Sequence, residues 1–182
     1  AEIQEFIGLR LDLKNEQALV LEWQWAVRGE LNGRDVVLTA NGPGPKLAGK
    51  AAQAVEENRR LEALVSYGFC GALDPALHIN DIVIGFEVQC GAGILACLLP
   101  KQQTTMPAPH RLLSTNRVIT TAQEKSALHK SGAAAVEMEA AGVAAYAQSR
   151  NIPFYCIRVV TDSANEDLPI DFNLFRDSDG RF

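Results

Sequence analysis

Continuously apolar segments of strand length recur along the chain, and segments with helical spacing separate them. The clearest apolar runs are residues 35–40 (DVVLTA), 81–88 (DIVIGFEV) and 154–160 (FYCIRVV). Residues 46–64 and 139–150 are rich in Ala and have the spacing of helices. Strands that are apolar on both faces belong to sheets that helices cover on both sides. The pattern therefore predicts an α/β fold.

Weaker signals predict the remaining elements. Asn32-Gly33 indicates a hairpin, which makes the sheet mixed. Thr121, with Glu124 three residues later, indicates the capped start of a helix over 121–131. A helix is also expected over 2–13, strands over 64–67, 93–99 and 117–120, apolar segments over 18–27 and 133–138, and a loop over 101–110. We predict a three-layer α/β/α sandwich with a mixed central sheet.

Length and charge narrow the function classes. The 182 residues and 19.7 kDa suit a single domain over residues 1–182 with a sizeable core. The formal net charge of −5 argues against a basic patch for nucleic acid. The longest apolar runs fall far short of the roughly 20 residues that span a bilayer, and no secretory leader opens the chain.

The cysteines have no metal-site or redox spacing. They lie in apolar stretches and form no CxxC pair, so we expect buried reduced thiols and a cytoplasmic protein. They are Cys70, Cys90, Cys97 and Cys156.

Candidate chemistry gathers where strands end, because ligands of α/β sheets bind at the carboxyl ends of strands. Glu139 follows an apolar segment among small side chains, where a carboxylate is costly unless donors such as a ribose diol meet it. The alternative is an ordinary acid at a helix N-terminus. Glu137, two residues earlier, would face the other way and could be structural.

Asp162 follows the last apolar strand directly, after Thr161. It could be an acid in a partly dry cleft that donates a proton, or an N-cap or turn residue. Glu5 would lie at the start of the first helix as a candidate base or as a solvated carboxylate. Gly68 and Gly71 either allow close approach of a ligand or make a tight turn.

Other familiar chemistries are poorly supported. The histidines, at 78, 110 and 129, lack metal or triad spacing, and no serine sits in a GxSxG setting. The turn at residues 42–46 (GPGPK) is not a phosphate-binding loop, because its prolines remove the N–H groups that a phosphate cradle needs.

Several motifs together resemble the nucleoside phosphorylase/nucleosidase superfamily. Residues 135–141 (AVEMEAA) and 158–162 (RVVTD) look like its signature, and residues 66–73 (SYGFCGAL) look like its glycine turn. Ala1 to Phe6 looks like the motif whose last glutamate activates water. The order and spacing of these motifs fit over most of the chain. By this resemblance, the family's first strand and C-terminal helix would lie outside residues 1–182.

The resemblance implies a role for each motif residue. Glu139 would bind the ribose 2′- and 3′-hydroxyls with Met138 under the sugar, Asp162 would protonate purine N7, and Glu5 would orient the nucleophile. Further substrate contacts are expected at Gly68, Phe69, Cys70, Gly71, Val136, Glu137 and Thr161. Cleavage of an N-glycosidic bond passes through an oxocarbenium-like transition state. It is helped by an acid that protonates the leaving base and by a base that activates the nucleophile.

The resemblance thus implies an enzyme that cleaves the N-glycosidic bond of a purine nucleoside or nucleoside conjugate. Water or phosphate would be the acceptor, with no metal and no other cofactor. Residues 74–77 (DPAL) and 171–173 (DFN) look closer to the hopanoid-associated phosphorylase branch. A homo-oligomer is expected, and a nucleoside-binding module without turnover is the alternative.

Overall fold

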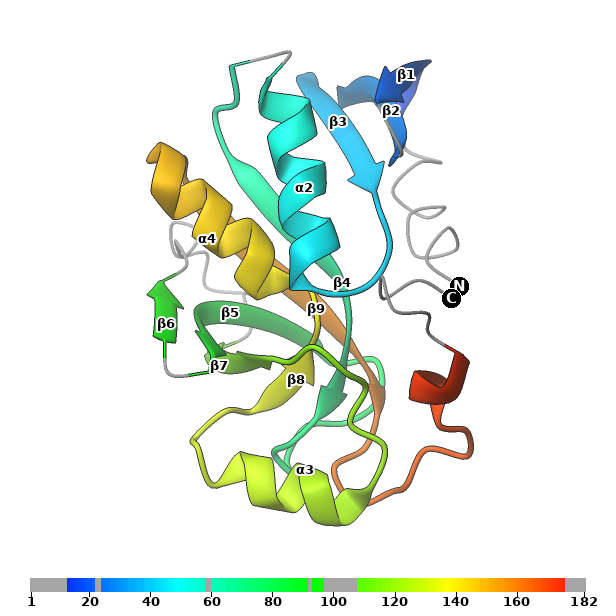
Figure 1. Cartoon of the computed structure of the whole chain (residues 1–182), viewed down its shortest axis with the longest axis vertical. Helices are drawn as coiled ribbons and strands as arrows, with labels where there is room; N and C mark the ends of the chain where they lie inside the picture. The colour runs from blue at the N-terminus through cyan, green and yellow to red at the C-terminus, as the bar shows by residue number, and fades with distance from the viewer. Residues whose placement is uncertain (1–12, 22–23, 58–59, 92, 97–107, 176–182) are drawn as a thin grey trace.

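The computed structural model describes residues 13–21, 24–57, 60–91, 93–96 and 108–175 (Figure 1). Strands and helices alternate as the sequence predicts. Their bounds, in chain order, are β1 (Lys14–Leu21), β2 (Gln24–Leu31), β3 (Arg34–Ala40), α2 (Pro45–Glu56), β4 (Leu64–Ala72), β5 (Ile82–Cys90), β6 (Gly93–Ala96), β7 (Pro109–Ser114), α3 (Ala122–His129), β8 (Ala135–Glu137), α4 (Ala140–Arg150), β9 (Phe154–Asp162) and the 3-10 helix η1 (Phe172–Phe175). Apart from Leu13, the helix predicted over 2–13 lies outside the described residues.

The strands form two sheets. The first is the antiparallel meander β1-β2-β3, with the predicted turn at Asn32-Gly33 between β2 and β3. The second has the order β6-β5-β7-β8-β4-β9 and contains both parallel and antiparallel pairs. It also curls, since β9 pairs with β5 as well as with β4. The predicted mixed α/β fold is confirmed, and the closure of the sheet is a feature that the sequence pattern did not show.

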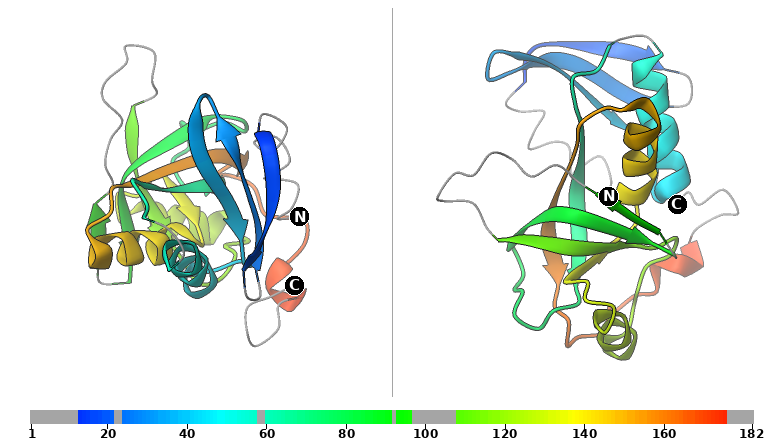
Figure 2. Two further views of the ribbon diagram at one scale, coloured as in Figure 1. Left: turned by 90° about the horizontal axis from the view of Figure 1, so that it is seen from above. Right: turned by 90° about the vertical axis from the view of Figure 1, so that its left-hand side faces the viewer.

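Helix α4 packs against this sheet, α2 lies beside α4 and against β3, and the third helix lies at the far end of the molecule. Both Figure 1 and Figure 2 show α2 beside α4, with α3 at the opposite end. The α2–α4 contact depends on a glycine: a Cβ on Gly142 would meet the Pro45 carbonyl oxygen at 1.7 Å. The two helix N-termini therefore touch through backbone, which brings the turn before α2 next to the start of α4.

Small and aliphatic side chains make the core. The main cluster joins α4 to β4, β5 and β9, and its fully buried members include Val83, Leu112, Ala147 and Cys156. The Ala-rich composition of residues 139–150 explains this position, because alanines allow a helix to approach a sheet closely. A second, smaller cluster surrounds Leu73 next to α3.

Three expected elements differ from the structure. Residues 117–120 are not a strand, because their backbone groups are bonded to other segments. The Val118 N–H donates to Asn173 Oδ1, and Asn173 Nδ2 donates to Val118 O, each at 2.9 Å. The Leu168 N–H donates to Thr120 O. The predicted loop over 101–110 was wrong at its end, where β7 begins at Pro109. The helix predicted over 46–64 ends at Glu56.

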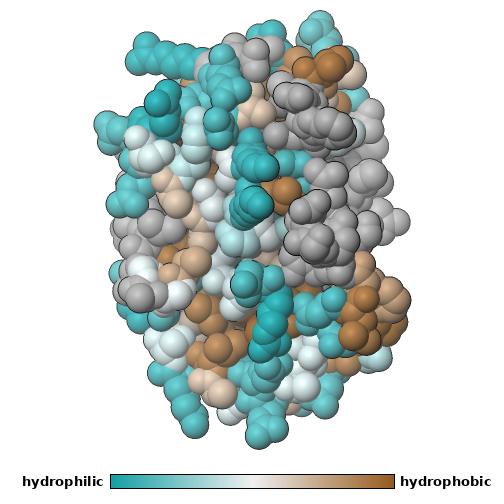
Figure 3. Space-filling view, in the orientation of Figure 1, coloured by the Kyte–Doolittle hydropathy of each residue, from teal (hydrophilic) through white to brown (hydrophobic). Residues whose placement is uncertain are grey.

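The surface around η1 is apolar. Ile170, Phe172, Leu174 and Phe175 are between 43% and 79% exposed, and they account for the brown group at the lower right of Figure 3, where Figure 1 places η1. No helix within the described ranges is long and apolar enough to cross a membrane.

Candidate functional site

The predicted site residues of three strands lie side by side across the sheet. Gly71 on β4 pairs with Val136 on β8 and with Asp162 on β9. Gly71 is half-buried and lies within the strand, so the tight turn that was one alternative for Gly68 and Gly71 is wrong. The missing side chain at Gly71 makes room for an acid, because a Cβ there would meet Asp162 Oδ2 at 2.7 Å.

Glu139 is the N-cap residue of α4, but its carboxylate does not cap the helix. Glu137 Oε2 accepts the N–H groups of Glu139 and Ala140 at 2.9 and 2.8 Å, and Ser114 Oγ accepts that of Ala141 at 3.2 Å. The amides at the start of α4 are thus satisfied by other groups. The Glu139 carboxylate is left to accept a bond of 3.1 Å from the Gly44 N–H.

The surroundings of Glu139 disfavour its charged form. The residue as a whole is partly exposed, while its carboxyl group is enclosed. Burial, together with the nearby Glu137 carboxylate, raises the pKa of Glu139 from 4.5 to about 7, against the opposing effects of Arg158 and the Gly44 N–H. A group that donates hydrogen bonds to this carboxylate would therefore stabilise it strongly.

Glu137 is buried and paired, as the structural alternative for this residue expects. Its Oε2 lies 2.6 Å from Arg158 Nη2, and both side chains are at most 1% exposed. Arg158 also donates to Ser66 Oγ and to Ser66 O, each at 2.8 Å. Although burial alone would lower it, the Glu137 carboxylate raises the pKa of Arg158. This pair joins the central strands β4, β8 and β9.

Asp162 is held by hydrogen bonds on both carboxylate oxygens. Its Oδ2 lies 2.7 Å from Lys125 Nζ, and its Oδ1 accepts from Thr161 Oγ1 at 2.8 Å. The Lys125 side chain is 0% exposed and that of Asp162 is 14% exposed. Asp162 is therefore neither an N-cap nor a solvated turn residue, but a nearly enclosed carboxylate with one cation beside it.

The other predicted residues are divided between the interior and the surface. Gly68 and Cys70 are buried in β4, whereas Phe69 between them is 44% exposed. Burial raises the pKa of the Cys70 thiol to about 12, so this cysteine stays a neutral thiol. Met138 is partly exposed beside Glu139, and Thr161 is exposed. Glu5 lies outside the described residues, so its role stays a prediction.

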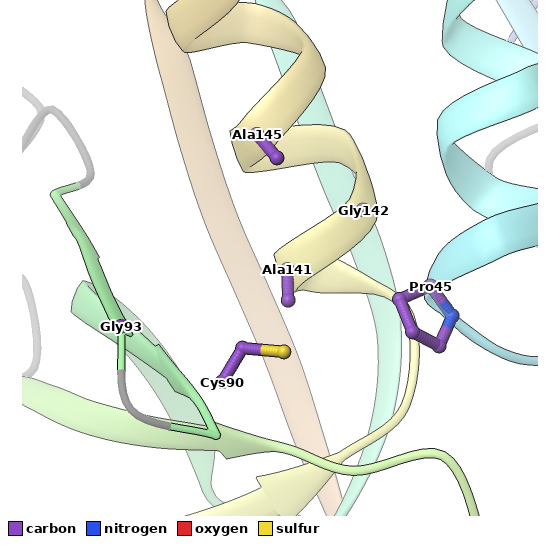
Figure 4. Close-up of a pocket in the computed structure, with 6 residues that line it drawn as sticks. All are labelled: Pro45, Cys90, Gly93, Ala141, Gly142 and Ala145. Carbon is purple, nitrogen blue, oxygen red and sulfur yellow. The ribbon is translucent and has the colours of Figure 1, made fainter.

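An apolar hollow of about 390 Å³ lies beside the start of α4 (Figure 4). Figure 4 shows the Cys90 side chain below Ala141, with Pro45 on the far side of the hollow. The lining is formed by Pro45, Cys90, Gly93, Ala141, Gly142 and Ala145. None of the candidate carboxylates lines it, so the hollow is separate from the residues that carry chemistry.

Two charged residues of the site were missed from the sequence. Arg158 interrupts the apolar run 154–160, and a charge inside such a run is a signal for a buried ion pair. Lys125 gave no signal, because a lysine in a short helix is ordinarily solvated.

Known proteins with similar sequences are nucleosidases. The 5′-methylthioadenosine/S-adenosylhomocysteine nucleosidase of Shewanella oneidensis is 29% identical in an alignment 178 positions long, and the match covers 82% of this chain and 75% of that protein. The enzyme of the same description from Shewanella sp. strain MR-7 has the same identity and coverage.

Solved structures give the same relationship. The nucleosidase of Neisseria meningitidis, in complex with methylthio-immucillin-A, has a TM-score of 0.79 and 25% identity, and the match covers 94% of this chain and 87% of that one. The S-adenosylhomocysteine nucleosidase of Streptococcus pyogenes has a TM-score of 0.81 at 18% identity, covering 94% and 85%, which shows a shared fold.

A family model of the Phosphorylase superfamily matches residues 25–115 and 92–181. These matches take in β2 to η1, and with them Glu139, Asp162 and the strands that hold both residues. The chain therefore belongs to the phosphorylase superfamily.

Proposed function

We propose that the protein hydrolyses the N-glycosidic bond of a purine nucleoside. The observation that carries this proposal is the state of Glu139: an enclosed carboxylate at a helix N-terminus whose amides are satisfied by Glu137 and Ser114. No salt bridge to Glu139 is found among the described residues. A vicinal diol offers two O–H donors, which suits such a carboxylate.

Asp162 supplies the acid in this reaction. Departure of the base leaves electrons on the purine ring, and a proton delivered to N7 neutralises them. A nearly enclosed carboxyl next to the exposed Thr161, at the end of β9, is suited to that transfer. Glu139 would hold the ribose while the C1′–N bond lengthens, and water would attack C1′ from the opposite side. Glu5 remains the predicted base for that water.

The turn before α2 favours water over phosphate as the acceptor. Pro43 and Pro45 have no N–H, and the Gly44 N–H is already bonded to Glu139. The usual anion site at a helix N-terminus needs several unoccupied N–H groups. Among the described residues, this turn therefore offers little to a phosphate. The named relatives, as nucleosidases, agree with hydrolysis.

The substrate class follows from the relatives. Their names specify 5′-methylthioadenosine and S-adenosylhomocysteine, and we propose an adenine nucleoside with a 5′-thioether for this chain. The cytoplasm as its location, a homo-oligomeric state and a relation to the hopanoid-associated branch remain predictions.

One assay tests the proposal. The protein is incubated with 5′-methylthioadenosine, S-adenosylhomocysteine or adenosine, with and without phosphate, and adenine and the sugar product are separated by chromatography. We expect adenine and a free sugar at a rate that does not depend on phosphate. A 1-phosphorylated sugar would instead establish phosphorolysis, and tight binding without product would establish a nucleoside-binding module.

Variants assign the roles. D162N should lower kcat by about 10²-fold or more, the usual contribution of a general acid. E139Q should raise KM for the ribonucleoside, and raise it less for the 2′-deoxy analogue, since that substrate keeps only one of the two donors. The exposed Glu62, changed to Gln, is the matched control and should behave as the wild type.

A further inference from the structure

Lys125 is a buried cation that the proposed reaction does not use. It is the one buried residue of α3, and its side chain is 0% exposed. A helix usually attaches to its domain through apolar side chains, because removing an ammonium group from water is costly. An aliphatic residue would fill this position at lower cost, so the charge itself calls for an explanation.

The ammonium group is fully coordinated and aimed at the acid. Lys125 Nζ donates to Ser163 O at 2.7 Å and to Glu166 O at 2.9 Å, and it lies 2.7 Å from Asp162 Oδ2. An ammonium has three N–H groups, so each finds an acceptor. The two carbonyls belong to the segment just after Asp162, and they fix the direction in which the third N–H points.

The Asp162 carboxylate is thereby fixed from three sides. Lys125 holds Oδ2, Thr161 Oγ1 holds Oδ1, and the Cα of Gly71 lies against the carboxylate where a Cβ would not fit. Thr161 Oγ1 also lies 3.2 Å from Cys70 O, so its single proton is shared between two acceptors. Lys125 is thus the stronger of the two hydrogen-bonding partners of the acid.

We propose that Lys125 is a positioning residue for Asp162: it fixes the carboxylate over Gly71. The inference rests on the proposed function, since it presumes that Asp162 protonates the leaving base. A fixed carboxylate delivers its proton in one direction, so loss of the lysine should slow the chemical step more than it weakens substrate binding.

The other groups near the pair do not hold the acid. Cys70 is neutral because of its raised pKa. Glu166 turns its carboxylate to the Ser163 N–H, at 2.9 Å, and only its carbonyl faces Lys125.

The test compares kcat and KM for the wild type, K125M, K125Q and the control K130M, which changes an exposed lysine just after α3. In K125M and K125Q we expect kcat to fall by about tenfold or more, part of the roughly 10²- to 10⁴-fold of general acid catalysis, with KM within about twofold. K130M should change neither.

Two further measurements exclude a merely structural effect. In K125A, n-propylammonium replaces the missing atoms of the side chain and should restore activity, whereas tetramethylammonium, which has no N–H, should not. In the D162N background, K125M should lower kcat no further, since Lys125 acts through Asp162. K125Q keeps an amide N–H₂ that can donate to the Ser163 and Glu166 carbonyls. It is the variant to be tested if K125M fails to fold.

The outcomes separate this inference from the proposed function. An unchanged kcat in the folded Lys125 variants, or an equal loss in the wild-type and D162N backgrounds, would overturn the inference while leaving the nucleosidase intact. A wild-type protein that releases no base would overturn both. A lowered kcat at nearly unchanged KM, restored by the amine, would establish Lys125 as the residue that positions the acid.

Discussion

Removing the charge of Glu139 should stabilise the fold while it damages the site. In the wild type, the Gly44 N–H lies 3.1 Å from Glu139 Oε1, and the glutamine of E139Q keeps an oxygen that can accept this bond. The substitution also removes an enclosed negative charge that lies near the Glu137 carboxylate. Residues placed for function commonly carry such a cost in stability. The sign of the effect distinguishes this reasoning from a purely structural role for Glu139.

The size of the effect follows from proton linkage. A tenfold change in proton affinity corresponds to about 1.4 kcal/mol, and the pKa of Glu139 rises from 4.5 to about 7 on folding. Because the native state holds this proton more tightly than the unfolded chain, its stability falls as the pH rises from about 4.5 to about 7. The full cost is at most about 3 kcal/mol. A partly enclosed amide N–H₂ in the variant costs about 1 kcal/mol, which leaves a gain of about 2 kcal/mol.

The assay is urea unfolding of the wild type, E139Q and the control E62Q at pH 4.5 and pH 8. We expect E139Q to match the wild type within about 1 kcal/mol at the lower pH and to exceed it by about 2 kcal/mol at the higher one. E62Q, which changes an exposed glutamate, should follow the wild type at both. A difference that is independent of pH, or a variant less stable at pH 8, would refute the argument.

Three other substitutions test the packing around the site. R158M should destabilise the fold by about 3–5 kcal/mol, because it leaves the buried Glu137 carboxylate unpaired; thermal and urea unfolding measure this. G71A places a Cβ 2.7 Å from Asp162 Oδ2, so we expect kcat to fall by about tenfold or more through displacement of the acid, and the unfolding midpoint to fall as well, because the buried Lys125 ammonium loses its partner. G142A must push the two helix N-termini apart and should cost about 1–3 kcal/mol in urea unfolding; unchanged stability would contradict the close contact.

The sequence was sufficient where local chemistry decides the structure. The turn Asn32-Gly33 joins β2 to β3, and Thr121 accepts the Glu124 N–H at 3.2 Å at the start of α3, as its capping motif predicts. The three-residue β8 was anticipated only as an apolar segment. Each of these signals comes from a few neighbouring residues, which is why it can be recognised without the fold.

Predictions failed where distant residues take over backbone groups. Residues 117–120 have the composition of a strand, but Asn173, 55 positions away along the chain, occupies both polar groups of Val118. The pairing of β9 with β5 likewise depends on how the sheet curls rather than on any local pattern. The same limit applies to the site. Glu139 and Asp162 were identified from their setting, whereas the lysine beside Asp162 belongs to a helix 37 positions earlier.

Glu137 and Glu139 show how two acids of one motif come to do different work. Glu137 ends the short strand β8 and Glu139 follows it, but Glu137 turns inward, where Arg158 neutralises it and the first amides of α4 bind it. This arrangement satisfies the helix N-terminus, which is otherwise the natural partner of Glu139. It also places a second negative charge nearby, which raises the pKa of Glu139 further. The motif therefore needs its first glutamate to keep the amides at the start of α4 from binding the carboxylate of the second one. Replacement of Glu137 by Gln should accordingly lower the pKa of Glu139 toward its ordinary value while it weakens the fold, an effect opposite to that of E139Q.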